Sequence, residues 1–399
     1  MSRIHLVGTA DTKAEELAFL AGLIRARAGD VCLVDLSTTQ SDFQADVTPA
    51  EVAACHPQGA GAVLGQTDRG VAVAAMGAAF ARFIAARADA GDVAGVLGIG
   101  GGGGTSMIAE GLRALPYGLP KIIVTTMAAG DTRPYIDISD LILMPAVTDL
   151  AGLNRLSRVI LSNAAEAICG MALHRAAATG ARPALGLTMF GVTTPCVTAI
   201  AAALRATHDC LVFHATGTGG RTMEKLADSG LLTGFVDITT TEVADLLFGG
   251  VLPATEDRFG AVIRTRLPWV GSVGALDMVN FGPPETVPDR FRGRQFYHHN
   301  PQVTLMRTTP EENVAMGRWI AGRLNQCEGE VRLLLPEGGV SMLDAPGQPF
   351  DDPAARAALF TALETTLRLT ARRRILRLPH HINDPAFAAA AVATFRDLA

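Results

Sequence analysis

The sequence alternates short runs of β-branched and aliphatic residues with longer, alanine-rich stretches of helical character. In the first half, apolar runs such as "RIHLVGT", "VCLVDLST" and "VAGVLGIG" are separated by stretches such as "KAEELAFLAGLIRAR" and "GVAVAAMGAAFARFIAARAD". This alternation is typical of βαβ units, which place parallel strands in one sheet. The apolar runs are continuous, as a sheet covered by helices on both faces requires. The pattern therefore predicts an α/β fold built on a doubly wound parallel sheet.

The same alternation starts a second time in the second half of the chain. A long helical pattern from about residue 150 to 179 ends at "GARP", because Gly180 and Pro183 stop a helix. Strand-like runs then recur in "ALGLTMF", "CLVFHAT" and "GFVDITT". We therefore predict two doubly wound, Rossmann-like domains, residues 1–181 and 182–399, that face each other across a central cleft. Residues 267–297 are rich in glycine and proline and predict a long irregular segment, which is either functional or disordered.

Length, charge and cysteine content narrow the class of protein. A chain of 399 residues is too long for one typical core, which supports the prediction of two domains. The formal net charge of −5 has no long block of either sign, so we expect no nucleic-acid partner. The N-terminus lacks the apolar core of a signal peptide, and no uninterrupted apolar run reaches the ~18 residues of a membrane span. The six cysteines show no CxxC spacing. These features predict a cytoplasmic protein without a membrane contact, a disulfide framework or a zinc framework.

The stretch "GIGGGGGTS", residues 98–106, contains five consecutive glycines directly after a strand-like run. Each glycine in a regular element costs roughly 0.5–1 kcal/mol relative to alanine, so the run needs a reason. A turn without side chains lets backbone N–H groups approach a phosphate, and the following helix adds the positive end of its dipole. Thr105 and Ser106 would then cap the helix or donate their hydroxyls to the anion. The alternative is that the glycines only permit close packing of strand and helix.

Two known phosphate-binding motifs do not match this stretch. A P-loop requires "GK[ST]" after the glycines, and the dinucleotide fingerprint requires the glycine turn after the first strand with an acid about 20 residues further on. However, a second glycine-rich turn, "HATGTGGRT", also follows a strand in the second half. Two turns in equivalent places favour an anion-binding function over accidental composition.

Polar residues follow the other strands of the first half. "GTADTK" supplies Asp11, Thr12 and Lys13, "VDLST" supplies Asp35, Ser37 and Thr38, and "TDRG" supplies Asp68 and Arg69. Lysine, arginine and hydroxyl groups suit a phosphate, and the end of the second strand is where ribose or base contacts are expected. The structural alternatives are that Asp11 or Thr12 caps a helix and that Arg69 forms a surface ion pair.

The second half contains the candidates for chemistry on a co-substrate. We predict catalytic roles for His214 and Arg221 in the second glycine turn, for Asp237 and Glu242 after the next strand, and for Glu337. Histidine titrates near neutral pH and can act as a base, although a single histidine at a strand end more often has a structural role. Asp277 and Asn280 are further candidates, and Glu337 and Asp344 are candidate ligands of magnesium or of a substrate. No residue is assigned as a resident metal ligand.

Long stretches of the chain resemble a known family. The motifs "GTADTK", "VDLST", "DRG", "GIGGGGGTS", "GDTRPYIDISDLILMPAVTDLAGLNRLSRVILSNAAEAICGM", "FHATGTGGRTMEKL" and "LLPEGGVSMLDAPGQPFDDP" are similar to those of the plant tobamovirus-resistance protein and its bacterial relatives. The resemblance covers nearly the whole chain. It implies a two-subdomain α/β fold, an ATP-binding N-terminal half and a homodimer.

The resemblance also implies particular nucleotide contacts. They fall on Asp11, Thr12 and Lys13, on Thr38, on Arg69 and on Gly101, Gly102, Gly103 and Gly104. One departure is visible at Gly102, where the family often has serine, which removes a hydroxyl donor but leaves the backbone turn intact.

Three functions compete at this stage. We expect an ATP- and Mg²⁺-dependent enzyme that acts on a small-molecule acid or alcohol in the interdomain cleft, by phosphoryl transfer or through an acyl phosphate. The first alternative is a non-catalytic module that binds ATP to control closure or oligomerisation. The second is a lyase or isomerase whose glycine turns bind a phosphorylated or carboxylate substrate.

Overall fold

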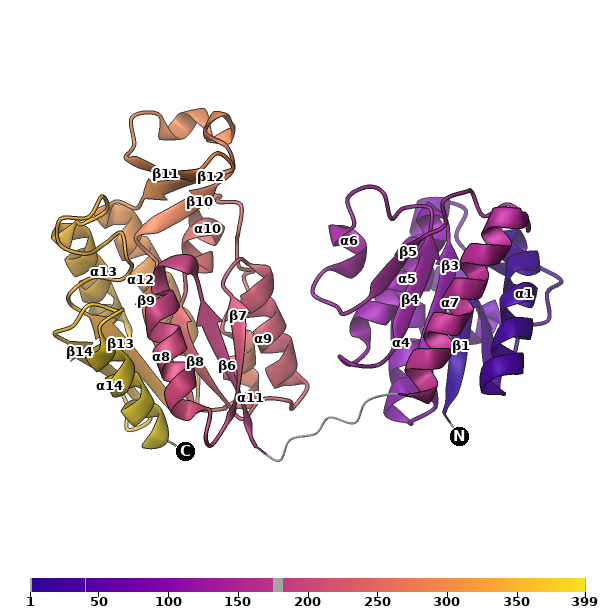
Figure 1. Cartoon of the computed structure of the whole chain (residues 1–399), viewed down its shortest axis with the longest axis horizontal. Coiled ribbons are helices and arrows are strands. Elements are labelled where there is room, and N and C mark those ends of the chain that lie inside the picture. Colours follow the sequence, from indigo (N-terminus) through magenta and orange to yellow (C-terminus); the bar gives the residue numbers. More distant parts are fainter. Residues whose placement is uncertain (1, 40, 175–181, 399) are drawn as a thin grey trace. The chain divides into compact units, whose positions relative to one another are not determined.

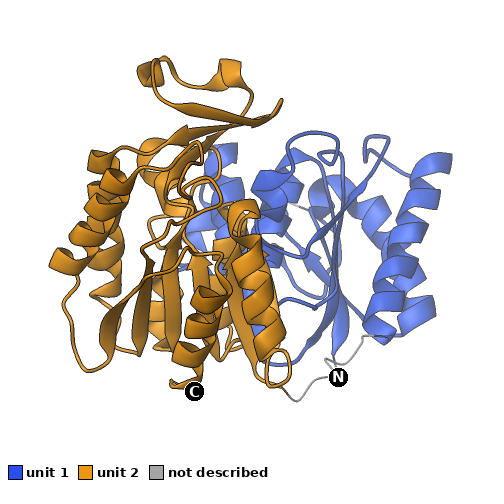
Figure 2. Cartoon of the chain, turned by 60° about the vertical axis from the view of Figure 1, so that its left-hand side comes forward, with its two compact units in different colours: residues 1–178 blue, residues 179–399 orange. Residues whose placement is uncertain are grey.

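The computed structural model describes residues 2–39, 41–174 and 182–398, which form two compact units. The N-terminal unit comprises residues 1–178 and the C-terminal unit residues 179–399 (Figure 2). The predicted boundary lies between residues 181 and 182. It directly follows residues 175–181, which lie outside the described residues. Each unit is an α/β fold around a parallel sheet, which confirms the predicted fold class.

The N-terminal unit is built on a five-stranded parallel sheet with the order β2-β1-β3-β4-β5. Its strands are β1 (Arg3–Gly8), β2 (Val31–Asp35), β3 (Val93–Gly100), β4 (Lys121–Thr125) and β5 (Ile142–Pro145). Its helices are α1 (Ala10–Ala28), α2 (Pro49–Ala53), α3 (Gly61–Leu64), α4 (Arg69–Asp89), α5 (Gly102–Ala114), α6 (Arg133–Ile136) and α7 (Arg155–Leu173). In this strand order the direction of winding reverses between β1 and β3, which makes that position the switch point of the sheet.

Adjacent residues of each strand point to opposite faces of this sheet, so the continuous apolar runs supply two cores. Leu6 and Leu97 pack under α1 and α7, whereas their neighbours Val7 and Val96 pack under α4 and α5. Helices therefore cover both faces of the sheet (Figure 1). This arrangement explains why the strands lack a polar alternation.

Two of these covering helices are also long and apolar enough, by length and composition, to cross a membrane. They are α4 and α7. In the structure, Phe80 of α4 and Leu161 of α7 are fully buried in the two cores of the sheet. Both helices therefore have the packing of core helices in a layered α/β unit, where an apolar sequence is needed to cover the sheet.

The C-terminal unit repeats the scheme with a six-stranded parallel sheet in the order β14-β13-β9-β8-β6-β7. Its strands are β6 (Ala184–Met189), β7 (Asp209–His214), β8 (Gly234–Thr239), β9 (Trp269–Gly274), β13 (Val331–Pro336) and β14 (Arg373–Leu378). Its helices are α8 (Thr194–Leu204), α9 (Thr218–Asp228), α10 (Glu242–Phe248), α11 (Gly260–Thr265), α12 (Pro310–Leu324), α13 (Pro353–Thr366) and α14 (Pro385–Arg396). The 3₁₀ turn η1 (Gly191–Thr193) precedes α8. Here the switch point lies between β6 and β8.

A small antiparallel sheet extends from this unit (Figures 1 and 2). Its strands are β10 (Met278–Phe281), β11 (Phe296–Asn300) and β12 (Val303–Arg307), in the order β10-β12-β11, with the 3₁₀ turns η2 (Pro284–Thr286) and η3 (Asp289–Phe291) between β10 and β11. The prediction that residues 267–297 are irregular is therefore wrong for β9, β10 and the start of β11. The sequence pattern did not predict β9 because glycines interrupt its apolar run. One of them, Gly271, makes room for the Trp269 ring, since a Cβ at Gly271 would lie 2.0 Å from a ring carbon.

Candidate functional site

A cavity of about 280 Å³ opens at the carboxyl edge of the N-terminal sheet, beside the switch point between β1 and β3. Open α/β sheets bind ligands at this position. The lining residues come from the ends of β1 and β2, from the start of α4 and from the first turns of α1 and α5. They are Thr9, Asp11, Thr12, Thr38, Thr39, Gln66, Thr67, Arg69, Ala72, Val73, Gly103, Gly104 and Met107.

The structure brings together part of the predicted nucleotide site. Six predicted residues line the cavity, namely Asp11, Thr12, Thr38, Arg69, Gly103 and Gly104. Lys13, Gly101, Gly102, Thr105 and Ser106 are not among its lining residues. Sequence reasoning missed Thr39, Gln66 and Thr67, although the first directly follows Thr38 and the other two directly precede Asp68 in the chain.

The turn from β1 into α1 is held by residues that were expected to contact ribose. One oxygen of Asp35, Oδ1, accepts hydrogen bonds from the backbone N–H of Ala10 at 3.0 Å and from the Ser37 hydroxyl at 2.5 Å. Ser37 Oγ in turn accepts from the backbone N–H of Asp11 at 2.9 Å. Asp35 and Ser37 are buried and line no part of the cavity. Their role is to fix the N-terminus of α1, which corrects the expectation of a ribose contact.

Asp11 and Thr12 do not cap α1, because the N-cap position is Thr9, which makes no capping hydrogen bond with its side chain. Asp11 Oδ2 instead accepts a hydrogen bond from the Thr39 hydroxyl at 2.5 Å, and the hydroxyls of Thr9 and Thr12 lie 3.0 Å apart. These four side chains line the cavity. The capping alternative for Asp11 and Thr12 is therefore wrong.

The glycine stretch forms the end of β3 and the first turn of α5. The N-cap is Gly101, which has no side chain, and the first intrahelical bond runs from the N–H of Thr105 to the Gly101 carbonyl at 2.8 Å. The N–H groups ahead of Thr105 therefore have no partner within the helix. Thr105 itself is buried, and its hydroxyl lies 2.6 Å from Thr125 Oγ1 and 3.2 Å from the Gly100 carbonyl. The predicted role of Thr105 as a cap or an anion donor is therefore wrong, and Ser106 is exposed but lies outside the lining.

The packing around each glycine separates the two explanations of this stretch. A Cβ on Gly98 would lie 2.7 Å from Ile108 Cγ2, and one on Gly100 would lie 2.7 Å from the backbone nitrogen of Thr105. Close packing of β3 against α5 therefore explains these two glycines. By contrast, a Cβ on any residue from Gly101 to Gly104 would meet no described atom closer than 3.6 Å, and none of the four has a positive φ. The fold gives no reason for these four glycines.

Two cationic side chains near the cavity have no recorded acidic partner within the described ranges. Arg69, at the first position of α4, lines the cavity and is exposed, and Lys13 is half-buried on α1. The neighbouring Asp68 caps α4 by accepting from the Val71 N–H at 2.9 Å, and among the described residues it forms no ion pair with Arg69. Asp11 is the carboxylate in the lining. Among the described residues, no group of three or more His, Cys, Asp and Glu side chains could hold a metal ion.

The second glycine turn has a different construction. A Cβ on Gly219 would lie 1.8 Å from the His214 carbonyl oxygen, and one on Gly220 would lie 2.2 Å from Glu242 Oε2. The carboxylate of Glu242 accepts the N–H groups of Gly217 at 2.7 Å and of Gly220 at 3.1 Å. An internal anion therefore occupies the N-terminus of α9. Packing explains these glycines, and the expectation that this turn binds an external anion is wrong.

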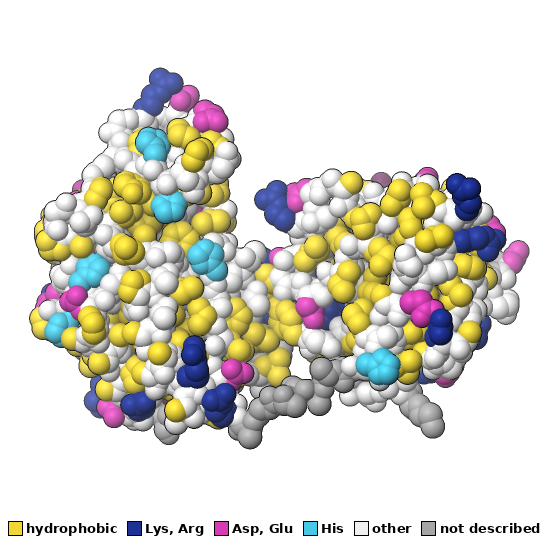
Figure 3. Space-filling model, in the orientation of Figure 1, with side chains coloured by type: hydrophobic (Ala, Val, Ile, Leu, Met, Phe, Trp, Pro, Cys, Tyr) yellow, Lys and Arg dark blue, Asp and Glu magenta, His cyan; other side chains and the backbone are white. Residues whose placement is uncertain are grey.

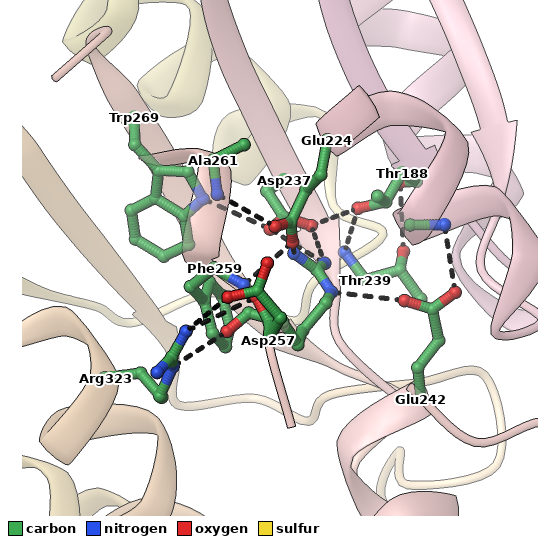
Figure 4. Close-up of polar contacts among 12 residues, drawn as sticks. Thr188, Glu224, Asp237, Thr239, Glu242, Asp257, Phe259, Ala261, Trp269 and Arg323 are labelled. Atoms are coloured by element: carbon green, nitrogen blue, oxygen red, sulfur yellow. Dashed lines mark hydrogen bonds and ion pairs between the residues drawn. The ribbon is translucent and has the colours of Figure 1, made fainter. Parts of the chain in front are cut away.

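Glu242 belongs to a buried ionic cluster around Arg258, which sequence reasoning missed. The Arg258 guanidinium contacts Glu224 at 3.0 Å, Asp237 at 2.8 Å and Glu242 at 3.2 Å. Figure 4 shows these three acidic side chains converging, with Thr188 donating to Asp237 at 2.6 Å. Burial raises the pKa of Glu224 and of Glu242, and the Arg258 charge opposes this rise.

This cluster corrects the predicted roles of Asp237 and Glu242. Both side chains are fully buried, and their carboxylates are bonded to Arg258 and to neighbouring groups of the same unit. Arg258 gave no sequence signal, because it lies in a loop between α10 and α11, far along the chain from the acids.

The remaining candidates of the C-terminal unit do not form one constellation. His214 is exposed at the end of β7 and stacks on Phe190 with ring centroids 5.3 Å apart. Glu337 follows β13 and pairs with Arg377 at 3.2 Å. Four strand spacings separate β7 from β13, or about 19 Å at the usual distance between strands.

Of the other predicted residues, Arg221 is half-buried on α9. Asp344 is buried and paired with Arg307 at 3.2 Å and with Arg356 at 2.8 Å, so it is not available as a magnesium ligand. Asp277 is buried and accepts from the Ser341 hydroxyl at 2.7 Å, and Asn280 is buried and bonded to Asp245.

Fold and cavity together define an α/β protein of two parallel-sheet units, with a glycine-lined pocket at the switch point of the first. Models of the uncharacterised protein family UPF0261 match almost the whole chain. The N-terminal domain model matches residues 2–177 and the C-terminal domain model matches residues 182–399. The chain belongs to this family.

Individual relatives agree with this assignment. A UPF0261 protein of Rhizobium meliloti is 66% identical over the full length of both chains. The tomato (Solanum lycopersicum) ToMV resistance protein Tm-1 is 44% identical over 99% of this chain and 56% of its own length. A UPF0261 protein of Clostridium tetani is 40% identical over 97% of this chain and 96% of its own.

Among solved structures, a Streptomyces glycosyltransferase complexed with thymidine diphosphate covers 68% of this chain and 82% of its own at 12% identity. Its TM-score is 0.18, which is too low to support a structural argument.

Proposed function

We propose that the N-terminal unit binds ATP in the cavity at its switch point and that the protein transfers a phosphoryl group from it in a Mg²⁺-dependent reaction. The observation that carries this proposal is the run from Gly101 to Gly104. These residues lack side chains although the protein around them leaves room for a Cβ. Space kept free at an uncapped helix N-terminus suits the phosphates of a nucleotide, which approach the backbone closely.

The chemistry of the cavity walls agrees with a nucleoside triphosphate. The N–H groups in the first turn of α5 would hold phosphate oxygens, and Arg69 and Lys13 would supply positive charge. On the other wall, Thr38, Thr39 and Gln66 offer donors and acceptors to a ribose and a base. The family resemblance implies the same ligand and includes Lys13, Thr38 and Arg69 among its contacts, but not Thr39 or Gln66.

The residues of the cavity also fit a magnesium ion carried by the nucleotide. Mg²⁺ on ATP usually takes one or two protein carboxylates and keeps phosphate and water as its other ligands. Asp11 would supply that carboxylate, oriented by its hydrogen bond from Thr39. When bound, Mg²⁺ neutralises the charge that develops on the phosphates during transfer.

A module that binds ATP without chemistry is the second candidate, and one observation favours it. Asp237 and Glu242, two of the acids predicted to act on a co-substrate, form ion pairs with Arg258 in the buried cluster. The two candidates differ in turnover. Incubation with Mg·ATP and small acids and alcohols, followed by analysis of ADP and AMP, would favour the module if ATP bound and no product formed. Tight binding of inorganic phosphate or a carboxylate without ATP would favour the lyase or isomerase.

The test of the ATP site is a pair of substitutions, Gly103→Ala and Gly104→Ala. We expect each to weaken Mg·ATP binding at least about 100-fold, because a methyl group fills space needed by a phosphate. We expect each also to raise the stability of the N-terminal unit by about 0.5–1 kcal/mol, because alanine is the better helix former. Isothermal titration measures the first effect, and hydrogen exchange of peptides from β3 and α5 measures the second.

The matched control is Gly22→Ala in α1, where a Cβ would meet nothing within 4 Å. It should give the same gain in stability and leave ATP affinity unchanged. If the variants at residues 103 and 104 bound ATP as tightly as the control did, the assignment of the phosphate site would be wrong.

A further inference from the structure

A second cavity, of about 400 Å³, opens at the same edge of the N-terminal sheet, where β4 and β5 end. Its walls are two short segments at the ends of these strands, residues 125–129 without Met127 and residues 145–149. The sequence motif "GDTRPYIDISDLILMPAVTDL" runs from one wall to the other, and the ATP site uses none of it.

The glycine turn connects the two cavities. Gly103 and Gly104 line the first cavity. On the other side of the turn, a Cβ on Gly101 would point at Thr126 Oγ1, 3.8 Å away, and Thr126 lines the second cavity. A phosphate chain that lies along the first turn of α5 therefore has the second cavity beside it.

The chemistry of this second cavity is that of a site for a neutral hydroxyl compound. Its lining contains Thr126, Thr148 and the carboxylate of Asp149, together with the buried Thr125, whose hydroxyl is already bonded to Thr105. It contains no lysine, arginine or histidine among the described residues. A carboxylate co-substrate would meet no cation here and would be repelled by Asp149. Hydroxyl groups, by contrast, can donate to a carboxylate and exchange hydrogen bonds with threonine.

The backbone at Val147 gives further evidence that this wall is specialised. Val147 has a φ of +65°, which is rare for a β-branched residue, and its side chain is 72% exposed. Local strain of this kind costs of order 1–3 kcal/mol and persists where the surrounding structure imposes it. Val147 lies between Ala146 and Asp149, and all three residues line the cavity.

We infer that the cavity lined by residues 125–129 and 145–149 binds an uncharged, hydroxyl-bearing co-substrate, and that Asp149 accepts the proton of the attacking hydroxyl. This inference rests on the proposed ATP site and narrows its substrate class from acids or alcohols to alcohols. The hydroxyl oxygen forms a bond to the γ-phosphorus of ATP as its proton passes to Asp149. The bond from the γ-phosphorus to the bridging oxygen breaks, and ADP leaves with that electron pair.

The first experiment measures transfer from [γ-³²P]ATP with Mg²⁺ to a panel of probes on the full chain. Glycerol, erythritol, ribose and myo-inositol serve as uncharged polyols, and acetate, propionate and succinate serve as carboxylates. We expect labelled product from at least one polyol and from no carboxylate. Transfer only to carboxylates, or hydrolysis that no polyol alters, would overturn the inference.

The second experiment separates binding of ATP from the step at Asp149. Asp149→Asn should leave the Kd for the non-hydrolysable analogue AMPPNP within twofold and lower the transfer rate about 100-fold or more, as loss of a general base does. Ala129→Phe, which fills the second cavity, should act in the same way. Asp89→Asn, on the exposed end of α4, is the control and should change neither quantity. Normal transfer in both cavity variants would overturn the inference.

A third measurement decides the matter if no probe is phosphorylated. Amide signals of Thr126 and Thr148 in ¹⁵N-labelled protein with AMPPNP should shift saturably with at least one polyol, and the absence of any such shift would count against the site. Failure of AMPPNP itself to bind would instead refute the proposed ATP site, so the two failures are distinguishable.

Discussion

The two glycine-rich turns look alike in the sequence and are used in opposite ways by the structure. In the first, Gly101 to Gly104 leave open space in front of the N-terminus of α5. In the second, Gly217 to Gly220 make room for other parts of the protein, and the Glu242 carboxylate accepts the N–H groups at the start of α9. The first turn is free to receive an anion, whereas the second already contains one.

This difference shows how a glycine needed for packing can be told from one kept free for a ligand. The distinction lies in what a Cβ would meet. At Gly219 it would meet a backbone oxygen at 1.8 Å, whereas at Gly103 it would meet only a methyl group of Val73, at 3.6 Å. The same residue type therefore supports a functional argument at one turn and none at the other.

The largest expected effect concerns Arg258, the cation that pairs with Glu242. Glu242 accepts the N–H groups of the second glycine turn, residues 217–220, which we call the filled turn. Arg258→Met should lower the unfolding free energy of the C-terminal unit by about 3–5 kcal/mol, because it leaves three carboxylates buried without their cation. Both tryptophans of the chain, Trp269 and Trp319, lie in this unit, so their fluorescence during urea unfolding reports on it alone.

Arg264→Met is the matched control for that substitution. Arg264 also contacts two acids, Asp228 and Asp257, but is half exposed, so the loss should stay below about 1 kcal/mol. Equal losses in the two variants would contradict a special role for the buried cluster.

The next effect tests the glycines of the filled turn. Gly219→Ala should destabilise the C-terminal unit by about 1–3 kcal/mol or more, because the methyl group would collide with the His214 carbonyl. Gly322→Ala in α12, where a Cβ meets nothing within 4 Å, should instead raise stability slightly in the same fluorescence assay. If Gly219→Ala left the unfolding free energy unchanged, the contrast with Gly103→Ala would be lost.

The buried Glu242 carboxyl group of the second glycine turn also predicts a dependence of stability on pH. Burial raises the pKa of Glu242 above its ordinary value, so between the unfolded and the folded pKa the folded state holds a proton that the unfolded chain has released. This contribution to stability is complete below the unfolded pKa and is lost as the pH rises through the folded value. In Glu242→Gln, the fall in unfolding free energy with rising pH should be shallower, by at most ~1.4 kcal/mol per pH unit. Urea unfolding from pH 4 upward measures the slope, and identical slopes in the two proteins would disprove the effect.

The smallest expected effect concerns Thr105, which directly follows Gly101 to Gly104, the first glycine turn, which we call the open turn. Thr105→Val should cost the N-terminal unit about 1 kcal/mol, because it removes the buried hydrogen bond to Thr125. ATP affinity should remain within twofold, since Thr105 is buried and is not among the residues that line the cavity. Hydrogen exchange of α5 and isothermal titration measure the two quantities. A large loss of affinity with unchanged stability would restore Thr105 as an anion donor.

Much of the fold could be predicted from local pattern. Continuous apolar runs such as "VAGVLGIG" gave β3 and the other central strands, because a sheet covered on both faces needs apolar residues at every position. The prediction failed at β9, where glycines replace apolar residues that would mark a strand and the Trp269 ring fills the space beside Gly271. It also failed at β10, which is a run of only four residues.

The residues of the candidate site, too, could be predicted only in part. Asp11, Thr38 and Arg69 could be found because each follows directly on a strand end or begins a helix, and the topology brings these ends to one edge. Asp35, Asp237 and Glu242 occupy comparable sequence positions but are buried in internal hydrogen bonds. Arg258, the partner of Asp237 and Glu242, lies at a position that no local pattern connects to them.

The sequence by itself determined the two α/β units, their parallel sheets and the strand ends at which polar groups gather. Periodicity and glycine content are local properties, and they are sufficient for these features. Only the tertiary structure decided which glycine turn is open and which is filled, because that depends on whether a side chain from elsewhere in the chain reaches the helix N-terminus. Glu242 reaches the start of α9, and no side chain caps the start of α5.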